Sequence, residues 1–166
     1  LSKSGITNFK VIFWPGNTTD LDVLNRLNEM IDTLKIHDLV TIYHHDFVPF
    51  HDMMVIWRRM NCGLQIADNE QLSTTFTEPL FFKKEIIVSD IEPYRIFNKK
   101  YDAQIPLVTL DQIELVKKME TIIAGNKTST SLLEYRSNII RENFNITKNI
   151  DRIVRDYEDQ VNRLSK

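Results

Sequence analysis

Short apolar runs alternate along this chain with longer stretches in which apolar residues recur at helical spacing. The short runs are rich in β-branched and aromatic residues, so they predict strands. They cover residues 9–14, 39–43, 62–67, 85–89 and 105–108. Between the first two runs, one apolar face indicates an amphipathic helix, formed by Leu21, Leu24, Leu27, Ile31 and Leu34. A second helix is predicted over about residues 50–60. The alternation of strands and helices predicts an α/β fold.

The same pattern predicts how the strands are connected. Strands separated by one helix pair in parallel through right-handed crossovers. The run from Ile86 to Val88 is apolar on both faces, as in a strand covered by helices on both sides. Beyond residue 108 the chain turns helical, with a capping box at Thr109-x-x-Gln112 and further helices over about residues 129–142 and 146–164. We therefore expect one Rossmann-like domain over residues 1–166, with a doubly wound parallel sheet of about five strands and C-terminal helices.

Composition narrows the class of protein. The chain has 166 residues, 42% hydrophobic and 27% charged, as expected for a globular domain with its own core. Its net charge of −2 argues against a nucleic-acid partner. Cys62 is the only cysteine, and it lies in an apolar run, so we expect it to be a small core residue. With no apolar run long enough for a membrane span and no signal peptide, we expect a cytoplasmic protein.

Candidate chemistry is concentrated in residues 68–78, between the third and fourth predicted strands. Two carboxylates, Glu70 and Glu78, stand eight residues apart with a hydroxyl-rich turn between them. The crevice at the carboxyl ends of parallel strands is the usual ligand site of such a fold. The first backbone N–H groups of a helix have no partner within the helix and favour anions such as phosphate. This turn is therefore predicted to bind a ligand that carries both phosphate and hydroxyl groups.

These residues also carry a family resemblance. The spacing Glu70-x7-Glu78, followed by Glu78-Pro-Leu-Phe-Phe-Lys-Lys-Glu-Ile-Ile-Val-Ser-Asp90, resembles the glutamate-led helix and next strand of retaining group 1 glycosyltransferases with the GT-B fold. The order around it is similar too, with Val48-Pro49, a helix to Met60 and a strand before the turn. Asn143-Phe-Asn-Ile146 resembles the closing segment of that family. The resemblance covers the chain from about residue 38 onward.

The resemblance implies that this chain is the nucleotide-sugar-binding half of a glycosyltransferase and that the N-terminal, acceptor-binding half lies outside it. Glu70 would be the catalytic-site carboxylate that holds sugar hydroxyls beside the reacting carbon. Glu78 would accept hydrogen bonds from the ribose of the nucleotide. The remaining donor contacts implied are the backbone around Gln71, Leu72 and Ser73, the hydroxyls of Ser73 and Thr74, and a loop at Phe47 and Val48 beside the base.

The resemblance also implies the partners. The donor would be a UDP- or GDP-linked sugar, used as a substrate with no further cofactor. The acceptor would be a glycan or a lipid-linked glycan, in the synthesis of a cell-surface or capsular polysaccharide, and the full-length protein could associate peripherally with a membrane. No metal is expected where hydrogen-bond donors and cations neutralise the phosphate. We interpret His44, His45 and His51 as loop and surface residues.

Two other functions remain open. The chain could be a non-catalytic GT-B-like domain used for assembly or regulation, or half of a sugar-nucleotide epimerase. The non-catalytic reading is favoured by the bulk of Gln71 and Ser73, where the family has small residues. It is also favoured by the lack of a clear counterpart for the family's diphosphate-binding Arg and Lys. The glycosyltransferase and the non-catalytic domain differ in the expected surroundings of Glu70 and Glu78. In a glycosyltransferase the two carboxylates face an open crevice with free N–H groups, whereas in a non-catalytic domain they are salt-bridged and closed over.

Overall fold

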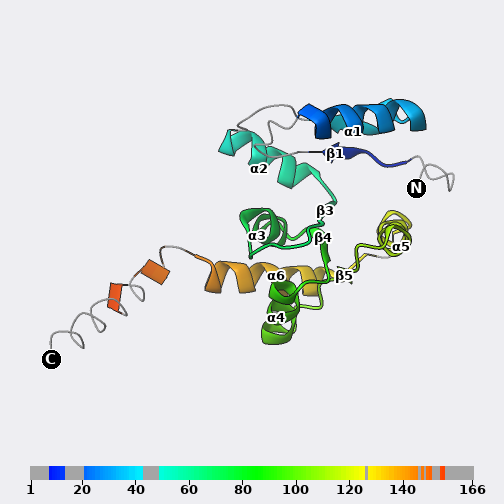
Figure 1. The fold of residues 1–166 in the computed structure, drawn as a ribbon. Coiled ribbons are helices and arrows are strands. Elements are labelled where there is room, and N and C mark those ends of the chain that lie inside the picture. The colour runs from blue at the N-terminus through cyan, green and yellow to red at the C-terminus, as the bar shows by residue number, and fades with distance from the viewer. Residues whose placement is uncertain are drawn as a thin grey trace.

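The computed structural model describes residues 8–13, 21–42, 49–125, 127–145, 147, 149–150 and 154–155. In this part of the chain, parallel strands alternate with helices, as predicted (Figure 1). The strands are β1 (Val11–Phe13), β2 (Val40–Ile42), β3 (Cys62–Gln65), β4 (Glu85–Ser89) and β5 (Leu107–Val108). They form two hydrogen-bonded groups, β1-β2 and β3-β4-β5, in which every pair is parallel. The expected five strands are found, but β1 and β3 share no ladder hydrogen bond that would join the two groups into one sheet.

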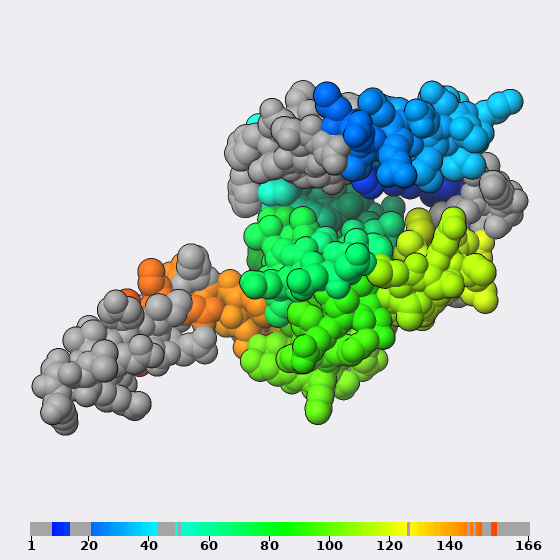
Figure 2. All heavy atoms as spheres, in the orientation of Figure 1, coloured from blue at the N-terminus to red at the C-terminus, as the bar shows by residue number. Residues whose placement is uncertain are grey.

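Six α-helices connect and cover the strands in the described part of the chain. They are α1 (Leu21–Leu34), α2 (Phe50–Arg59), α3 (Thr74–Phe81), α4 (Glu92–Tyr101), α5 (Gln112–Ile123) and α6 (Thr130–Asn143). Helices α3 and α6 lie side by side (Figure 1). Figure 2 shows the α1 segment, in blue, on one side of the green residues, which include α3. None of the described helices is both long and apolar enough to cross a lipid bilayer.

The start of α5 differs from the predicted capping box. Asp111 is the N-cap, and its side chain accepts hydrogen bonds from the backbone N–H groups of Ile113 and Glu114. Thr109 instead donates to the Glu114 carboxylate through its N–H and its hydroxyl. A carboxylate at the N-cap accepts from two backbone donors at once, so the helix begins two residues later than the Thr109 cap would require. Leu110 and Ile113, two large apolar residues on either side of the helix start, are 59% and 66% exposed.

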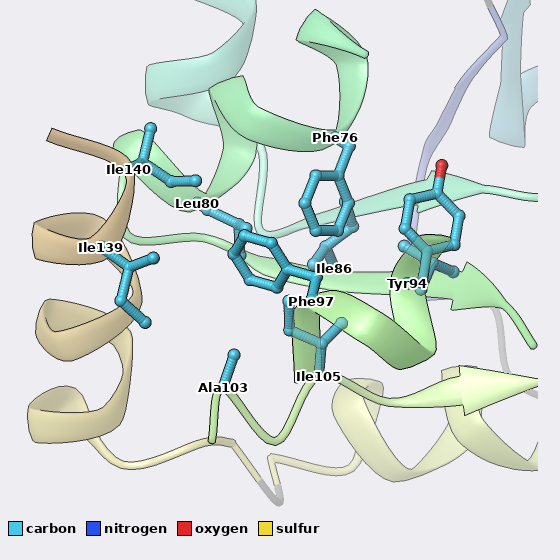
Figure 3. Close-up of a cluster of buried hydrophobic side chains, with 10 residues drawn as sticks. Phe76, Leu80, Ile86, Tyr94, Phe97, Ala103, Ile105, Ile139 and Ile140 are labelled. Atoms are coloured by element: carbon cyan, nitrogen blue, oxygen red, sulfur yellow. The ribbon is translucent and has the colours of Figure 1, made fainter. Parts of the chain in front are cut away.

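The core lies around β4, whose five residues are all buried. The apolar cluster brings together residues of α3, β4, α4, α6 and the turn before β5 (Figure 3). Its members are Phe76, Leu80, Ile86, Val88, Tyr94, Phe97, Ala103, Ile105, Ile139 and Ile140. Aromatic rings contact one another within this cluster. The ring of Phe76 is stacked on that of Tyr94, with 4.8 Å between the ring centroids. This core fixes the position of α3 and therefore of the predicted ligand-binding turn.

The predicted last helix lies mostly outside the described residues. Of the large apolar residues in this segment, Ile150 and Val154 are described, and about half of each residue's surface is exposed.

Candidate functional site

The turn between β3 and α3 lies at the carboxyl end of β3, as predicted. Ser73 occupies the N-cap of α3, but its hydroxyl is paired with the hydroxyl of Thr75 at 2.8 Å and makes no cap hydrogen bond. No described residue accepts a hydrogen bond from the backbone N–H of Leu72, Thr74 or Thr75. The start of α3 therefore presents free donors at the edge of the sheet where an anionic ligand is expected.

Two of the three backbone groups predicted to face a diphosphate are already used. The N–H of Gln71 donates to Glu70 Oε1 at 3.2 Å, and the N–H of Ser73 donates to the Gln71 carbonyl at 2.7 Å. Of the three predicted groups, only the N–H of Leu72 has no acceptor among the described residues. The backbone N–H groups of Thr74 and Thr75 are also without a described acceptor. The available donors are thus displaced along the turn toward the helix.

Glu70 is half-buried in this turn. Its Oε2 accepts a hydrogen bond from the side-chain amide of Gln65, at the end of β3, at 3.0 Å. Among the described residues no cation forms a salt bridge with Glu70. The carboxylate is therefore oriented by neutral groups and keeps its negative charge available to a ligand.

Glu78 lies in the second turn of α3 and has different neighbours. Its Oε2 accepts a hydrogen bond from the indole Nε1 of Trp57, on α2, at 2.7 Å. Burial raises the pKa of Glu78, and the hydrogen bond from Trp57 partly opposes that effect. Glu78 also lines a concavity of about 240 Å³. The other lining residues are Met54, Thr77, Phe81, Phe82, Ile140 and Phe144. Within the described part of the chain no salt bridge involves Glu78.

The structure adds one residue that the sequence analysis did not select. Tyr94, in the first turn of α4, is buried, and no described residue makes a hydrogen bond with its hydroxyl. Figure 3 shows this hydroxyl pointing away from the rest of the apolar cluster. Burial and the nearby negative charge of Glu70 raise the pKa of Tyr94 to about 12. A tyrosine early in the helix after β4 is the sequence signal that could have identified it, because that helix starts at the same edge of the sheet.

The ends of β3 and β4 are held together at this edge. The N–H of Ala67 donates to Ser89 Oγ at 2.7 Å. Arg95 stands close by on α4, but its guanidinium forms an ion pair with Asp90 at 2.6 Å. Arg95 is therefore already paired with a carboxylate at this edge of the sheet.

The remaining predicted residues are placed as follows. Thr74 is exposed at the first position of α3. Phe47, Val48, His44 and His45 lie outside the described residues, whereas His51 is exposed on α2. In the part of the chain that is described, no three His, Cys, Asp or Glu side chains gather closely enough to hold a metal ion.

Comparisons with known proteins support the fold. No protein-family model matches the sequence, and no curated protein matches it. The structure is similar to the crystal structure of Anabaena HepE in complex with UDP, with a TM-score of 0.71 and 14% sequence identity. The similarity covers 95% of this chain and 43% of the HepE chain, so this chain spans less than half the length of that protein. At this identity the likeness concerns the fold alone, and it confirms the predicted α/β class with parallel strands.

Proposed function

We propose that this chain is the donor-binding part of a retaining glycosyltransferase that uses a UDP-linked sugar. The observation that carries the proposal is the similarity of nearly the whole chain to less than half of a protein that binds UDP. The placement of Glu70 and Glu78 around the start of α3 supports it independently, because the resemblance in sequence is centred on those residues.

The turn has the chemistry that glycosyl transfer requires. Departure of a nucleoside diphosphate builds negative charge on phosphate oxygens, which preoriented hydrogen-bond donors stabilise. The free N–H groups of Leu72, Thr74 and Thr75 would supply those donors, with the hydroxyls of Ser73 and Thr74 beside them. The positive end of the α3 dipole lies at the same place and favours the same charge.

The two carboxylates would take separate roles. Glu70, on the turn, would hold sugar hydroxyls next to the reacting carbon. Glu78, inside α3, would accept hydrogen bonds from the ribose. The base would lie beside Phe47 and Val48. The acceptor, a glycan or a lipid-linked glycan of a polysaccharide pathway, would be held by a second domain in the cytoplasm or at its membrane surface, because transfer requires both substrates to be fixed across a cleft.

A non-catalytic GT-B-like domain is the second candidate. It is favoured by the hydrogen bonds that Glu70 and Glu78 already make to Gln65 and Trp57, and by the commitment of Arg95 to Asp90. A domain of this kind would keep the fold without binding a nucleotide.

Calorimetric titration with UDP and GDP distinguishes the two candidates. We expect UDP to bind, and Glu78→Ala to weaken binding by about 1–3 kcal/mol, the scale of a hydrogen bond to a charged group. Glu142→Ala is the matched control, because Glu142 is an exposed carboxylate of α6. Binding that both substitutions leave unchanged would move the site elsewhere, and absence of binding by the full-length protein would favour the non-catalytic domain.

A further inference from the structure

Trp57 lies where α2, β3 and α3 meet. Its indole N–H donates to Glu78 Oε2 at 2.7 Å, and both side chains are half-buried. The two residues are 21 positions apart in the sequence, so the contact depends on how α2 and α3 approach each other across β3. A half-buried hydrogen bond to a carboxylate is stronger than a neutral one and fixes direction as well as distance.

The indole of Trp57 packs against the backbone of β3. A Cβ atom added at Gly63, in β3, would lie 3.2 Å from Cγ of Pro79 and 3.6 Å from Cζ3 of Trp57. Both rings therefore pack against the bare glycine backbone. Pro79 follows Glu78 directly in α3, and its ring is buried. Because Gly63 has no side chain, the indole and the Pro79 ring both fit against β3, beside the helix that carries the carboxylate.

The Glu78 carboxylate keeps capacity for further hydrogen bonds. Its Oε2 is the acceptor for Trp57, and no described residue donates to its Oε1. An ionised carboxylate accepts about four hydrogen bonds in all. Since Glu78 also lines the concavity between α2, α3 and α6, a ligand has access to this side chain.

We propose that Trp57 is a positioning residue for nucleotide recognition, which holds Oε2 of Glu78 so that Oε1 accepts hydrogen bonds from a vicinal diol such as the ribose of a nucleoside diphosphate. The proposal rests on the proposed function of this site. On this proposal, Trp57 and Glu78 together select a ribose over a deoxyribose. A ribose donates two hydrogen bonds to the fixed carboxylate, and a deoxyribose, which lacks one hydroxyl, donates only one.

The test compares UDP with 2′-deoxy-UDP by calorimetry, on the wild-type protein and on Trp57→Phe. Phenylalanine keeps an aromatic ring against Gly63 and Pro79 but removes the N–H. We expect the substitution to weaken UDP binding about three- to tenfold and 2′-deoxy-UDP binding less than twofold, on the scale of one hydrogen bond. Equal weakening of both nucleotides would mean a structural role for Trp57, and unchanged binding of both would mean no role; either result overturns the proposal.

The outcomes separate this proposal from the function on which it rests. If Glu78→Ala weakens UDP binding and Trp57→Phe does not, the ribose role of Glu78 stands and the positioning role is refuted. If the wild-type protein binds neither nucleotide, both the proposed function and the positioning role are refuted.

A fluorescence titration tests the same idea if Trp57→Phe does not fold. The chain has two tryptophans, Trp14 and Trp57, so Trp14→Phe leaves Trp57 as the only indole reporter. We expect its emission to change as Glu78 titrates, and no such change in the matched Trp14→Phe/Glu78→Gln protein. Saturating UDP should lower the pH midpoint of this change more than 2′-deoxy-UDP does, since the diol stabilises the charged carboxylate. An equal effect of the two nucleotides would refute the proposal.

Discussion

Removing the Glu85 carboxylate should lower the free energy of unfolding of this domain more than removing any other charged group named above. Glu85 begins β4 and is buried. Its two oxygens accept hydrogen bonds from the N–H and the hydroxyl of Thr128, at 2.6 and 2.8 Å. Its Oε2 also lies 3.6 Å from Nη1 of Arg136, a buried nitrogen that makes no hydrogen bond with any described residue.

The magnitude follows from what Glu85→Ala leaves behind. Arg136 still donates to the carbonyls of Ala103 and Gln104 and so stays buried in place. Burial lowers the pKa of Arg136, and the charge of Glu85 opposes this effect. Breaking a buried pair by removing one partner leaves an uncompensated charge and costs about 3–5 kcal/mol. We expect a loss in this range, because the two hydrogen bonds from Thr128 are lost as well.

Urea denaturation followed by circular dichroism measures this loss. Glu134→Ala is the matched control, because Glu134 forms an exposed ion pair with Lys83 and its removal should leave the urea midpoint nearly unchanged. The double variant Glu85→Ala/Arg136→Met should recover part of the loss, since no unpaired charge remains. A loss below about 1 kcal/mol for Glu85→Ala would refute the reasoning and would mean that Arg136 is solvated in solution.

Four further substitutions or measurements test the core and the site. Ile87→Ala, in the fully buried β4, should lower the free energy of unfolding by about 2–5 kcal/mol, and a loss below about 1 kcal/mol in urea denaturation would mean that this strand is not central. Tyr94→Phe should leave that free energy unchanged or raise it by up to about 1 kcal/mol, because it removes a buried hydroxyl without a described partner; a clear loss would reveal a hydrogen bond to it. Burial, together with the charge of Glu85, raises the pKa of the Cys62 thiol to about 12. Iodoacetamide at pH 8 should therefore alkylate the native protein much more slowly than the urea-unfolded chain, and equal rates would contradict this expectation. Burial raises the pKa of Glu78 in the folded state, so its contribution to stability is present below the pKa of a free glutamate and is lost as the pH rises through the folded pKa. The urea midpoint should therefore fall relative to that of Glu78→Gln as the pH rises above about 4, and parallel profiles would refute the shift.

The strand and helix pattern could be predicted because it depends on local periodicity. The apolar run around Ile87 became the buried strand β4, and the stripe from Leu21 to Leu34 became α1. The start of α5 could not be predicted from the capping box, because Thr109 and Asp111 compete for the same position. Which of them caps the helix depends on hydrogen-bond geometry that spacing alone does not fix. The division of the strands into two hydrogen-bonded groups likewise depends on tertiary geometry, which local periodicity does not encode.

The position of the turn could be predicted, but its free donors could not. Their identity depends on where the Glu70 side chain lies, because its carboxylate takes the N–H of Gln71 and leaves that of Leu72. The hydrogen bond between Trp57 and Glu78 is equally invisible in the sequence. It arises because Gly63 lets two helices approach closely, and no local pattern links these three residues.

Glu78 and Glu85 have different surroundings, and the difference argues that the predicted ligand site around Glu78 is more than a structural feature. A carboxylate inside α3 that served stability alone would be expected to have a cation or several donors, as Glu85 has in Arg136 and Thr128. Glu78 has one indole N–H, and burial works against its charge. Local features that reduce stability are expected where function requires them, because a ligand supplies the missing interactions. Under the proposed function, a molecule that carries both a diol and a phosphate would satisfy the unused oxygen of Glu78 and the free N–H groups at the start of α3.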